Sequence, residues 1–263
     1  MRLLTWNVQG CQGVDQRVDP ARIAAEVRRI ADPDVACFQE IAVGFEGGGN
    51  QINALLRELP GYRGFFFSAV DVPGQAANRQ RLGNLILSRL PVGRVLRHSL
   101  PWPSAPDTPS MPRVAVEIVV GELRIITTHL EYYSREHRAA QIQRLQELEQ
   151  QARAEHQRVA EPGPFQSLPR PSSAILCGDF NLPPDDALHG EVLKAGFVDA
   201  WPALHPGTPH PHTFRVHERE EGKAPYCCDF VFVSADLVPR LRSIRVDGET
   251  QASDHQPVTL ELE

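Results

Sequence analysis

Apolar and polar residues alternate along several short segments of this chain, and this pattern predicts β-strands. The first is Leu3 to Val8, which has Asn7 near its end. Continuous apolar runs bounded by turn residues, such as Val35 to Phe38, are typical of buried strands. The same patterns predict further strands at Tyr62 to Ser68, Leu82 to Ser88, Val114 to Val120, Leu123 to Thr128, Tyr226 to Val233, Arg242 to Val246 and Val258 to Leu262.

The stretch from Ala174 to Asn181 is the most informative of these segments. It begins as a buried strand and carries Asp179 and Asn181 at its end, just before Pro183-Pro184. Side chains two residues apart share one face of a strand, so both are expected to point into one pocket. Burying either group unpaired costs free energy, which favours a functional site. A turn capped by Asp179 and a strained backbone angle at Asn181 explain the stretch equally well.

Helices are predicted where apolar residues recur every three or four positions. Asp19 is a typical N-cap and Pro20 a typical first helical residue. Asn50 and Ser134 are expected to cap two further helices, and Ala187 to Ala195 is a fourth. Loops are expected at Val70 to Arg81, Pro101 to Pro112, Glu161 to Pro171 and Pro202 to His212.

The order of these elements predicts the fold class. Strands come in runs separated by few helices, and several are joined by short turns such as Gly121-Glu122. This favours an α+β protein in which two mainly antiparallel sheets pack face to face with helices outside. No charge block or low-complexity linker divides the 263 residues, so a single domain over 1–263 is expected.

Composition narrows the possible partners. The formal net charge is −6, which argues against a protein that grips long nucleic acid mainly by neutralising its backbone. Nearly all cations are arginines, with lysine only at Lys194 and Lys223, and arginine suits forked contact with phosphate. No membrane-length apolar stretch and no secretory leader is present, so we expect a cytoplasmic protein. The five cysteines lack metal-ligand spacing and are expected to be reduced core residues.

Polar residues stand at the ends of separate predicted strands. One such placement is unremarkable, but a whole set suggests a shared pocket. The set is Asn7, Glu40, Asn84, His129, Asp179, Asn181, Asp229, Asp254 and His255.

The short sequence motifs around these residues are similar to those of a known superfamily. The motifs, in order, are Thr-Trp-Asn, Gln-Glu, Gly-Asn-Leu-Ile-Leu-Ser-Arg, Thr-His-Leu, Gly-Asp-Phe-Asn and Ser-Asp-His. Together they resemble the endonuclease/exonuclease/phosphatase superfamily of deoxyribonuclease I-like phosphoesterases. The resemblance covers the chain from Leu3 to Leu262 and implies a four-layer α/β/β/α sandwich. It also implies an enzyme that hydrolyses a phosphate ester with Mg²⁺ or Mn²⁺ as its cofactor.

By motif match, Glu40 is the main metal ligand, with Asn7 beside it and Asp254 near the metal. A hard divalent ion prefers carboxylate and amide oxygens, which agrees with this set. A solvent-facing residue after a strand is the alternative for Glu40. The superfamily's abasic-site endonucleases often have an acid where this chain has Gln9, which weakens the case for that branch and for a second tightly held metal.

The resemblance also assigns catalytic roles. Asp179 matches the residue that activates the attacking water, and Asn181 matches one that holds the phosphate or orients the water. His255 contacts the phosphate, Asp229 orients His255, and His129 supplies another phosphate contact. Phosphoryl transfer concentrates charge on oxygens, so positive groups must be fixed around them. A paired core acid at Asp229 and an ordinary strand-end histidine at His129 are the alternatives.

Substrate contacts are expected from Asn84, His212, Arg79 and Arg81. The alternatives are an asparagine that only bonds backbone at Asn84 and surface positions for the other three. The substrate is a phosphate ester, and long nucleic acid is possible but not favoured. A nuclease of the same superfamily and a non-catalytic phosphate-binding member are the alternative functions. Oligomeric state is left open.

Overall fold

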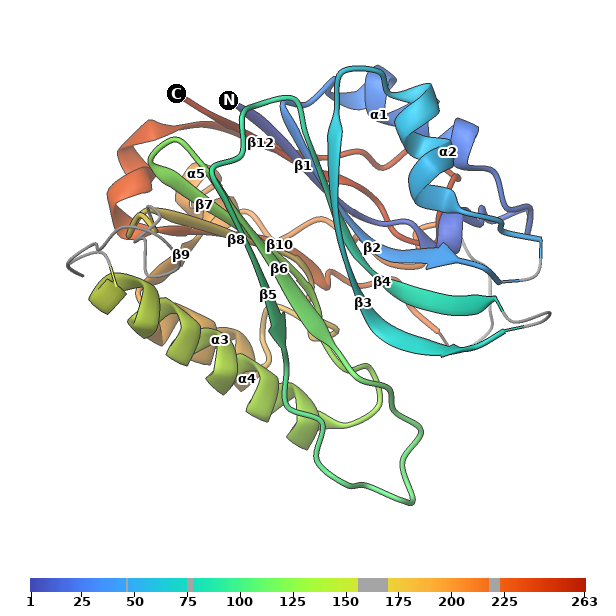
Figure 1. The fold of residues 1–263 in the computed structure, drawn as a ribbon. Coiled ribbons are helices and arrows are strands. Elements are labelled where there is room, and N and C mark those ends of the chain that lie inside the picture. Colours follow the sequence, from blue (N-terminus) through green and yellow to red (C-terminus); the bar gives the residue numbers. More distant parts are fainter. Residues whose placement is uncertain (46, 75–77, 156–169, 218–222) are drawn as a thin grey trace, which may run out of the picture.

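The structure is a computed structural model that describes residues 1–45, 47–74, 78–155, 170–217 and 223–263. Two β-sheets form its centre, and helices cover their outer faces (Figure 1). In the described chain, the first sheet has the order β11 (Leu241–Val246), β12 (Val258–Leu262), β1 (Arg2–Asn7), β2 (Val35–Val43), β4 (Arg79–Ser88) and β3 (Arg63–Pro73). The second has the order β5 (Arg94–Ser99), β6 (Val114–Val120), β7 (Leu123–His129), β8 (Ala174–Asp179), β10 (Asp229–Ser234) and β9 (Phe197–Asp199).

Each sheet contains one parallel pair of strands, and its other neighbours are antiparallel. The parallel pairs are β1 with β2 and β7 with β8. Parallel neighbours need a crossover, and α1 (Pro20–Ile30) provides it between β1 and β2, while α3 (Arg135–Glu155) follows β7. The two pairs contact each other across the interface between the sheets. The predicted sandwich of two mainly antiparallel sheets is confirmed.

Three apolar clusters hold the layers together, and the alternation along β1 shows how. Leu3 belongs to the cluster between the two sheets, whereas Leu4 and Trp6 pack toward α1 and α2 (Gln51–Glu58). The third cluster joins the second sheet to α3 and α4 (Ala187–Lys194), as Figure 1 illustrates. Full burial of one such large apolar side chain contributes about 1.5–3 kcal/mol.

The predicted helix caps are confirmed. Asp19 Oδ1 accepts the backbone N–H groups two and three residues further on, at 3.0 and 3.1 Å. Asn50 Oδ1 accepts from the backbone N–H three residues later at 3.1 Å, and Ser134 Oγ does the same at 3.2 Å. These bonds satisfy N–H groups that the first turn of a helix leaves free.

The prediction of a loop from Val70 to Arg81 is wrong. β3 continues to Pro73, and β4 already begins at Arg79, while residues 75–77 lie outside the described chain. Register pairs and an ion pair between Asp71 Oδ1 and Arg79 Nε at 2.6 Å join these ends. Both side chains are largely exposed, so this part of the hairpin lacks the apolar alternation by which strands are recognised.

Other boundaries also differ from expectation. β10 begins at Asp229 rather than at Tyr226, and the strands β5 and β9 were not predicted, nor was α5 (Ala200–Leu204). β5 mixes arginine and histidine with two apolar residues, without regular alternation, on an edge of the sheet where polar side chains are tolerated. Of the predicted loop from Glu161 to Pro171, residues 161–169 lie outside the described chain. Two 3₁₀ segments of the described chain are η1 (Gln9–Cys11) and η4 (Ala235–Arg240).

A charged cluster is buried beneath α3. Glu117 on β6 makes a two-pronged contact with Arg170, whose Nε and Nη2 lie 3.0 Å from its two carboxylate oxygens. Arg124 on β7 pairs with Glu149 on α3, and all four side chains are buried. Because each charge has a partner, the cluster fastens the helix to the sheet without an isolated buried ion.

All five cysteines are free and buried, as predicted. Within the described residues, no helix combines the length and the apolar character needed to cross a bilayer.

Candidate active site

Strand ends from both sheets meet at one place. Asn7 ends β1, His129 ends β7 and Asp179 ends β8, with His129 and Asp179 directly opposite each other in the parallel register. Asp229, the first residue of β10, lies opposite Asp179 on the other side. Strand pairing therefore fixes three of the predicted residues in a row across the second sheet.

Glu40 reaches the site through an irregularity in β2. The register between β2 and β4 shifts between Phe38 and Ile41, and Glu40 has a φ of 59°. Such a bulge redirects a side chain that regular pleating sends elsewhere. The neighbouring Gln39 stays buried between the sheets, where its Nε2 donates to Thr127 Oγ1 at 2.8 Å.

Asp179 is the hub of the site. Its Oδ2 accepts from Asn7 Nδ2 at 3.0 Å and lies 3.4 Å from His129 Nε2 and 3.7 Å from His255 Nε2. Its Oδ1 accepts the backbone N–H of Asn181 at 2.9 Å, with Asn181 at a φ of 51°. Burial, above all, and the charge of Asp229 raise the pKa of Asp179 to about 7, against the lowering effect of His255. A carboxylate with this pKa is suited to accept a proton near neutral pH.

His255 is held as a cation. Its Nδ1 lies 2.9 Å from Asp229 Oδ2, and the ring of Phe214 lies against it with centroids 4.5 Å apart. Burial alone lowers the pKa of His255, but the charges of Asp229 and Asp179 outweigh it and raise the pKa to about 10. The charged ring directs Nε2 toward Asp179.

His129 differs from the expectation of a positive phosphate contact. Burial, followed by the charges of Arg113 and His255, lowers its pKa well below the usual value, so the ring is neutral. Asn181 Nδ2 lies 2.9 Å from His129 Nε2 and also donates to Leu130 O at 2.8 Å. Because Nε2 accepts from Asn181, the ring proton is on Nδ1. The neutral ring can therefore still donate one hydrogen bond, from Nδ1.

Glu40 and Asn7 form the side of the site that fits a divalent cation. Asn7 Nδ2 donates to Glu40 Oε1 at 3.0 Å, and the Glu40 side chain is 30% exposed. Ser253 links Asp254 to this end of β1, since Ser253 Oγ donates to Asn7 O at 2.7 Å and lies 3.2 Å from Asp254 Oδ1. The partly exposed Glu40 carboxylate suits a hard ion that keeps several waters. Asn7 is buried, and its Oδ1 accepts the backbone N–H of Gln9 at 3.1 Å.

Arg113 is a site residue that the sequence did not reveal. It lines a small pocket together with Glu40, Asn84 and His129. Its side chain is buried, with Nε 3.5 Å from Glu131 Oε2, and its Nη1 has no hydrogen-bond partner among the described residues. The only signal is an arginine directly before a strand, at the end of the loop from Pro101 to Pro112.

The remaining predicted substrate residues lie at different distances from this set. Asn84 lines the same pocket, and its Nδ2 donates to Val114 O at 2.9 Å. Arg81 is half-buried in β4, opposite Val43 on β2. Arg79 is paired with Asp71 on the exposed hairpin.

His212 is exposed, whereas the two residues that follow it are built into the site. Thr213 Oγ1 accepts the backbone N–H groups of Cys228 and Asp229, both at 3.1 Å. Phe214 packs on His255. The predicted substrate contact of His212 therefore stays a prediction, while its neighbours Thr213 and Phe214 contact Asp229 and His255.

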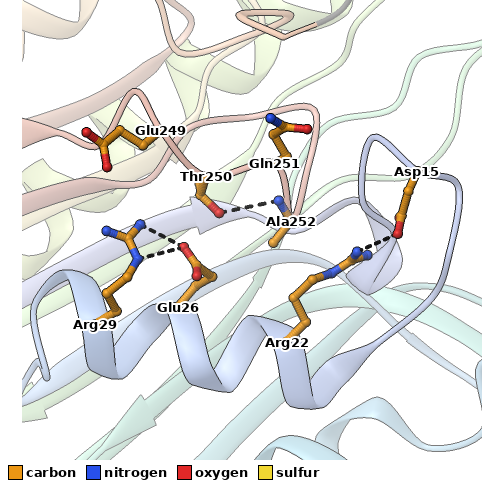
Figure 2. Close-up of a pocket in the computed structure, with 8 residues that line it drawn as sticks. All are labelled: Asp15, Arg22, Glu26, Arg29, Glu249, Thr250, Gln251 and Ala252. Atoms are coloured by element: carbon orange, nitrogen blue, oxygen red, sulfur yellow. Dashed lines mark hydrogen bonds and ion pairs between the residues drawn. The ribbon is translucent and has the colours of Figure 1, made fainter.

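A second hollow, of about 410 Å³, lies between α1 and residues 249–252 (Figure 2). Arg22 pairs there with Asp15 at 2.8 Å, and Arg29 pairs with Glu26 at 2.7 Å. Both arginines already have anionic partners, and none of the strand-end residues lines this hollow. The cluster around Asp179 is therefore the better candidate for chemistry.

Comparison with known proteins agrees with this geometry. The sequence matches the model of the Endonuclease/Exonuclease/phosphatase family over residues 4–255. The chain belongs to this family. Its members are hydrolases that act on phosphate esters, and they generally depend on a divalent metal. No curated protein matched the chain.

Solved structures of the endonuclease/exonuclease/phosphatase family share the fold. One from Beutenbergia cavernae is 21% identical with a TM-score of 0.72, and the match covers 99% of this chain and 70% of that one. A 3′ phosphatase from Neisseria bound to product DNA hairpin is 20% identical, with a TM-score of 0.66 and coverage of 100% and 99%. A mannosyl-6-phosphatase from Bacteroides thetaiotaomicron is 19% identical, with a TM-score of 0.69 and the same coverage.

Proposed function

We propose that this protein is a phosphate ester hydrolase that uses Mg²⁺ or Mn²⁺ and activates the attacking water with Asp179. One observation supports the proposal most. Asp179 is a buried carboxylate with a raised pKa, and side chains from both sheets surround it. Perturbed pKa values cluster at functional sites, and a pKa near neutrality suits a general base.

The chain's own residues divide the work. Asp179 takes a proton from water as the water oxygen attacks phosphorus. The phosphorus–oxygen bond to the alcohol breaks, and the leaving alkoxide oxygen takes a proton from solvent. Asn181 positions the attacking water or a phosphate oxygen. His255, kept charged by Asp229, donates from Nε2 to a nonbridging oxygen and stabilises the charge that develops there. His129 adds a neutral donor.

Glu40, Asn7 and Asp254 would hold the divalent ion. When bound, such an ion neutralises phosphate charge and acts as a Lewis acid. Mg²⁺ fits this set better than a softer metal because the donors are oxygens.

A small phosphate ester is favoured over long nucleic acid. The net charge is −6, and Arg22, Arg29 and Arg79 are each paired with a carboxylate. The alternative function is a nuclease. Its support is the structural likeness to a 3′ phosphatase that was solved with DNA.

The test is hydrolysis of a panel of simple monoesters and diesters, sugar phosphates, inositol phosphates, phospholipid head groups and oligonucleotides, each with Mg²⁺, Mn²⁺ or chelator. We expect metal-dependent hydrolysis by the wild type and a loss of about 100-fold or more in Asp179→Asn. Asp185→Asn is the matched control, because Asp185 is exposed in the segment after β8. Phosphate binding without turnover in the wild type would instead support the non-catalytic alternative.

A further inference from the structure

A second cluster of metal-ligating side chains lies apart from the active site, beside β9. His189 is on α4, Asp199 ends β9, and His210 is in the segment after α5. His189 Nε2 lies 2.9 Å from Asp199 Oδ2, and His210 Nε2 lies 2.8 Å from the same oxygen. The three ligand atoms all lie within 4.8 Å of one another. Three separate elements thus converge on one point.

The surroundings of this cluster are apolar. Asp199 is 3% exposed and His189 is 8% exposed. The ring of Phe230 packs on both imidazoles, with centroids 5.1 Å from His189 and 5.5 Å from His210. A carboxylate in such surroundings needs a positive partner or strong donors. Asp199 Oδ1 already accepts the backbone N–H of Trp201 at 2.9 Å, which leaves Oδ2 for the two histidines.

We propose that His189, Asp199 and His210 form a binding site for a first-row transition metal, with Zn²⁺ as the best match. Two imidazole nitrogens and one carboxylate oxygen are a borderline-soft donor set, which suits zinc and its neighbours rather than Mg²⁺. Each imidazole binds through Nε2 as the neutral ring, with its proton on Nδ1. Water completes the coordination from the side of His210, whose side chain is 14% exposed.

This site differs from the active site in chemistry as well as in place. Glu40, Asn7 and Asp254 offer only oxygen, whereas this cluster offers two nitrogens. The proposal therefore stands whether or not the hydrolytic function is correct.

A metal here fixes the segment that leads to Thr213 and Phe214, which contact Asp229 and His255. His210 precedes Thr213 by three residues, and Thr213 Oγ1 accepts the N–H of Asp229. Phe214 follows and packs on His255. A metal ion that holds His210 to α4 and β9 therefore limits the movement of this support. Its role is to position the segment rather than to take part in catalysis.

The experiment is a titration of metal-free protein with Co²⁺ in excess Mg²⁺, followed by visible absorption and then by competition with Zn²⁺. The Glu40→Gln variant serves as the background, so that the proposed Mg²⁺ site does not contribute. We expect one equivalent of Co²⁺ to bind with d–d absorption bands and to be displaced by Zn²⁺. His210→Ala and His189→Gln should weaken binding by about 100-fold or more, since each removes a ligand.

His205→Ala is the matched control. His205 lies in the same segment and packs on Trp201 with ring centroids 4.3 Å apart, but its Nε2 faces Ile244 O at 3.2 Å. This variant should bind Co²⁺ as the wild type does. Thermal unfolding gives a second measurement, because a ligand of the native state raises Tm. Zn²⁺ should raise the Tm of the parent and of His205→Ala but not that of His210→Ala.

Absence of saturable Co²⁺ and Zn²⁺ binding in the folded parent would overturn the proposal, and so would unchanged binding in His210→Ala. The hydrogen bonds of His189 and His210 to Asp199 would then only stabilise the fold. Circular dichroism of each variant shows whether a loss of binding is a loss of fold. His210 is the preferred site for substitution because it is the most exposed of the three.

Discussion

At the scale of single residues, the site depends on how burial and charge set the pKa of neighbouring groups. Asp179 and His255 are both buried, yet their pKa values rise for different reasons. Burial favours the neutral form of each group, which raises the pKa of the acid and lowers that of the base. The carboxylates around His255, chiefly Asp229 and Asp179, reverse the effect for the histidine. The charge state of the site therefore depends on Asp229.

The Asp229→Asn variant tests this dependence. The amide removes the charge that raises the pKa of His255, so burial dominates and the pKa falls from about 10 toward or below its ordinary value. The imidazolium is then lost as the pH rises through the lowered pKa. We expect activity to fall about 100- to 1,000-fold at pH 8 and to recover partly at lower pH. A pH–rate profile with NMR titration of the His255 ring measures both effects. An unchanged His255 pKa in this variant would contradict the assignment.

Arg113 leads to a separate prediction about substrate binding. Its buried guanidinium lines the pocket beside Glu40 and His129 and has one nitrogen without a partner among the described residues. A phosphate oxygen supplies the missing acceptor, so Arg113→Met should reduce kcat/KM by about 10- to 100-fold, corresponding to one charged hydrogen bond. The same change should raise the pKa of His129, because the Arg113 charge lowers it. Arg113→Lys should restore part of the activity, and no rescue together with an unchanged His129 pKa would assign Arg113 a purely structural role.

The sequence identified residues that follow strands but not this arginine. Asn7, His129 and Asp179 follow apolar runs, so their placement at strand ends is visible in the pattern. Arg113 follows a proline-rich loop, and nothing in its neighbourhood separates it from a surface arginine. Its role depends on a contact with Glu131, 18 residues away, that only the folded chain creates.

At the scale of elements, the buried charges beneath α3 make the stability of the fold depend on pH. Burial raises the pKa of Glu117, but hydrogen bonds from His98 and Arg170 and the charges of Arg170 and Arg124 outweigh it, so the pKa falls to about 2. A carboxyl group whose pKa is lower in the folded state stabilises the fold above its unfolded pKa, near 4.5. That stability is lost as the pH falls toward 2.

Glu117→Gln should therefore destabilise the protein by about 3–5 kcal/mol at pH 7, because Arg170 and Arg124 lose a buried partner. Between pH 5 and pH 2 the variant should lose less further stability than the wild type. Urea unfolding over this range measures both quantities. Glu122→Gln is a suitable control, since Glu122 is exposed in the adjoining turn. If the stability of Glu117→Gln and of the wild type fell in parallel over this pH range, the partners of Glu117 would not lower its pKa.

Elements were predictable where one face is apolar and failed where both faces are polar. The hairpin of β6 and β7 follows from two apolar runs on either side of the turn Gly121-Glu122. The outer ends of β3 and β4 carry Asp71 and Arg79, which pair across the strands in solvent. Their stabilisation comes from backbone pairing and this cross-strand contact, neither of which leaves an apolar pattern.

At the scale of the whole molecule, two similar halves create the site. Each half contributes a parallel strand pair, and the ends of β1 and β2 face those of β7 and β8. Gly178 allows the close approach within the second pair, since its φ is 134° and an added Cβ would lie 2.0 Å from Thr128 O. The order of elements along the chain predicted two packed sheets, and the motif resemblance added the four-layer sandwich. The pairing of distant strands follows from chain topology. Local pattern cannot specify which strand ends meet.

The charge of the whole molecule leads to the last prediction. With a net charge of −6, the protein repels a polyanion at long range, while the cationic His255 is buried and acts over a short distance. Long duplex DNA should therefore inhibit hydrolysis of a small ester weakly, and the inhibition should depend little on salt between 50 and 200 mM, because few counterions are released (about 0.9 per neutralised phosphate). Inorganic phosphate is the matched competitor, since it carries the charge without the length. Strong inhibition by DNA with a steep decline in added salt would instead place a nucleic-acid track beside Asp179 and favour the nuclease alternative.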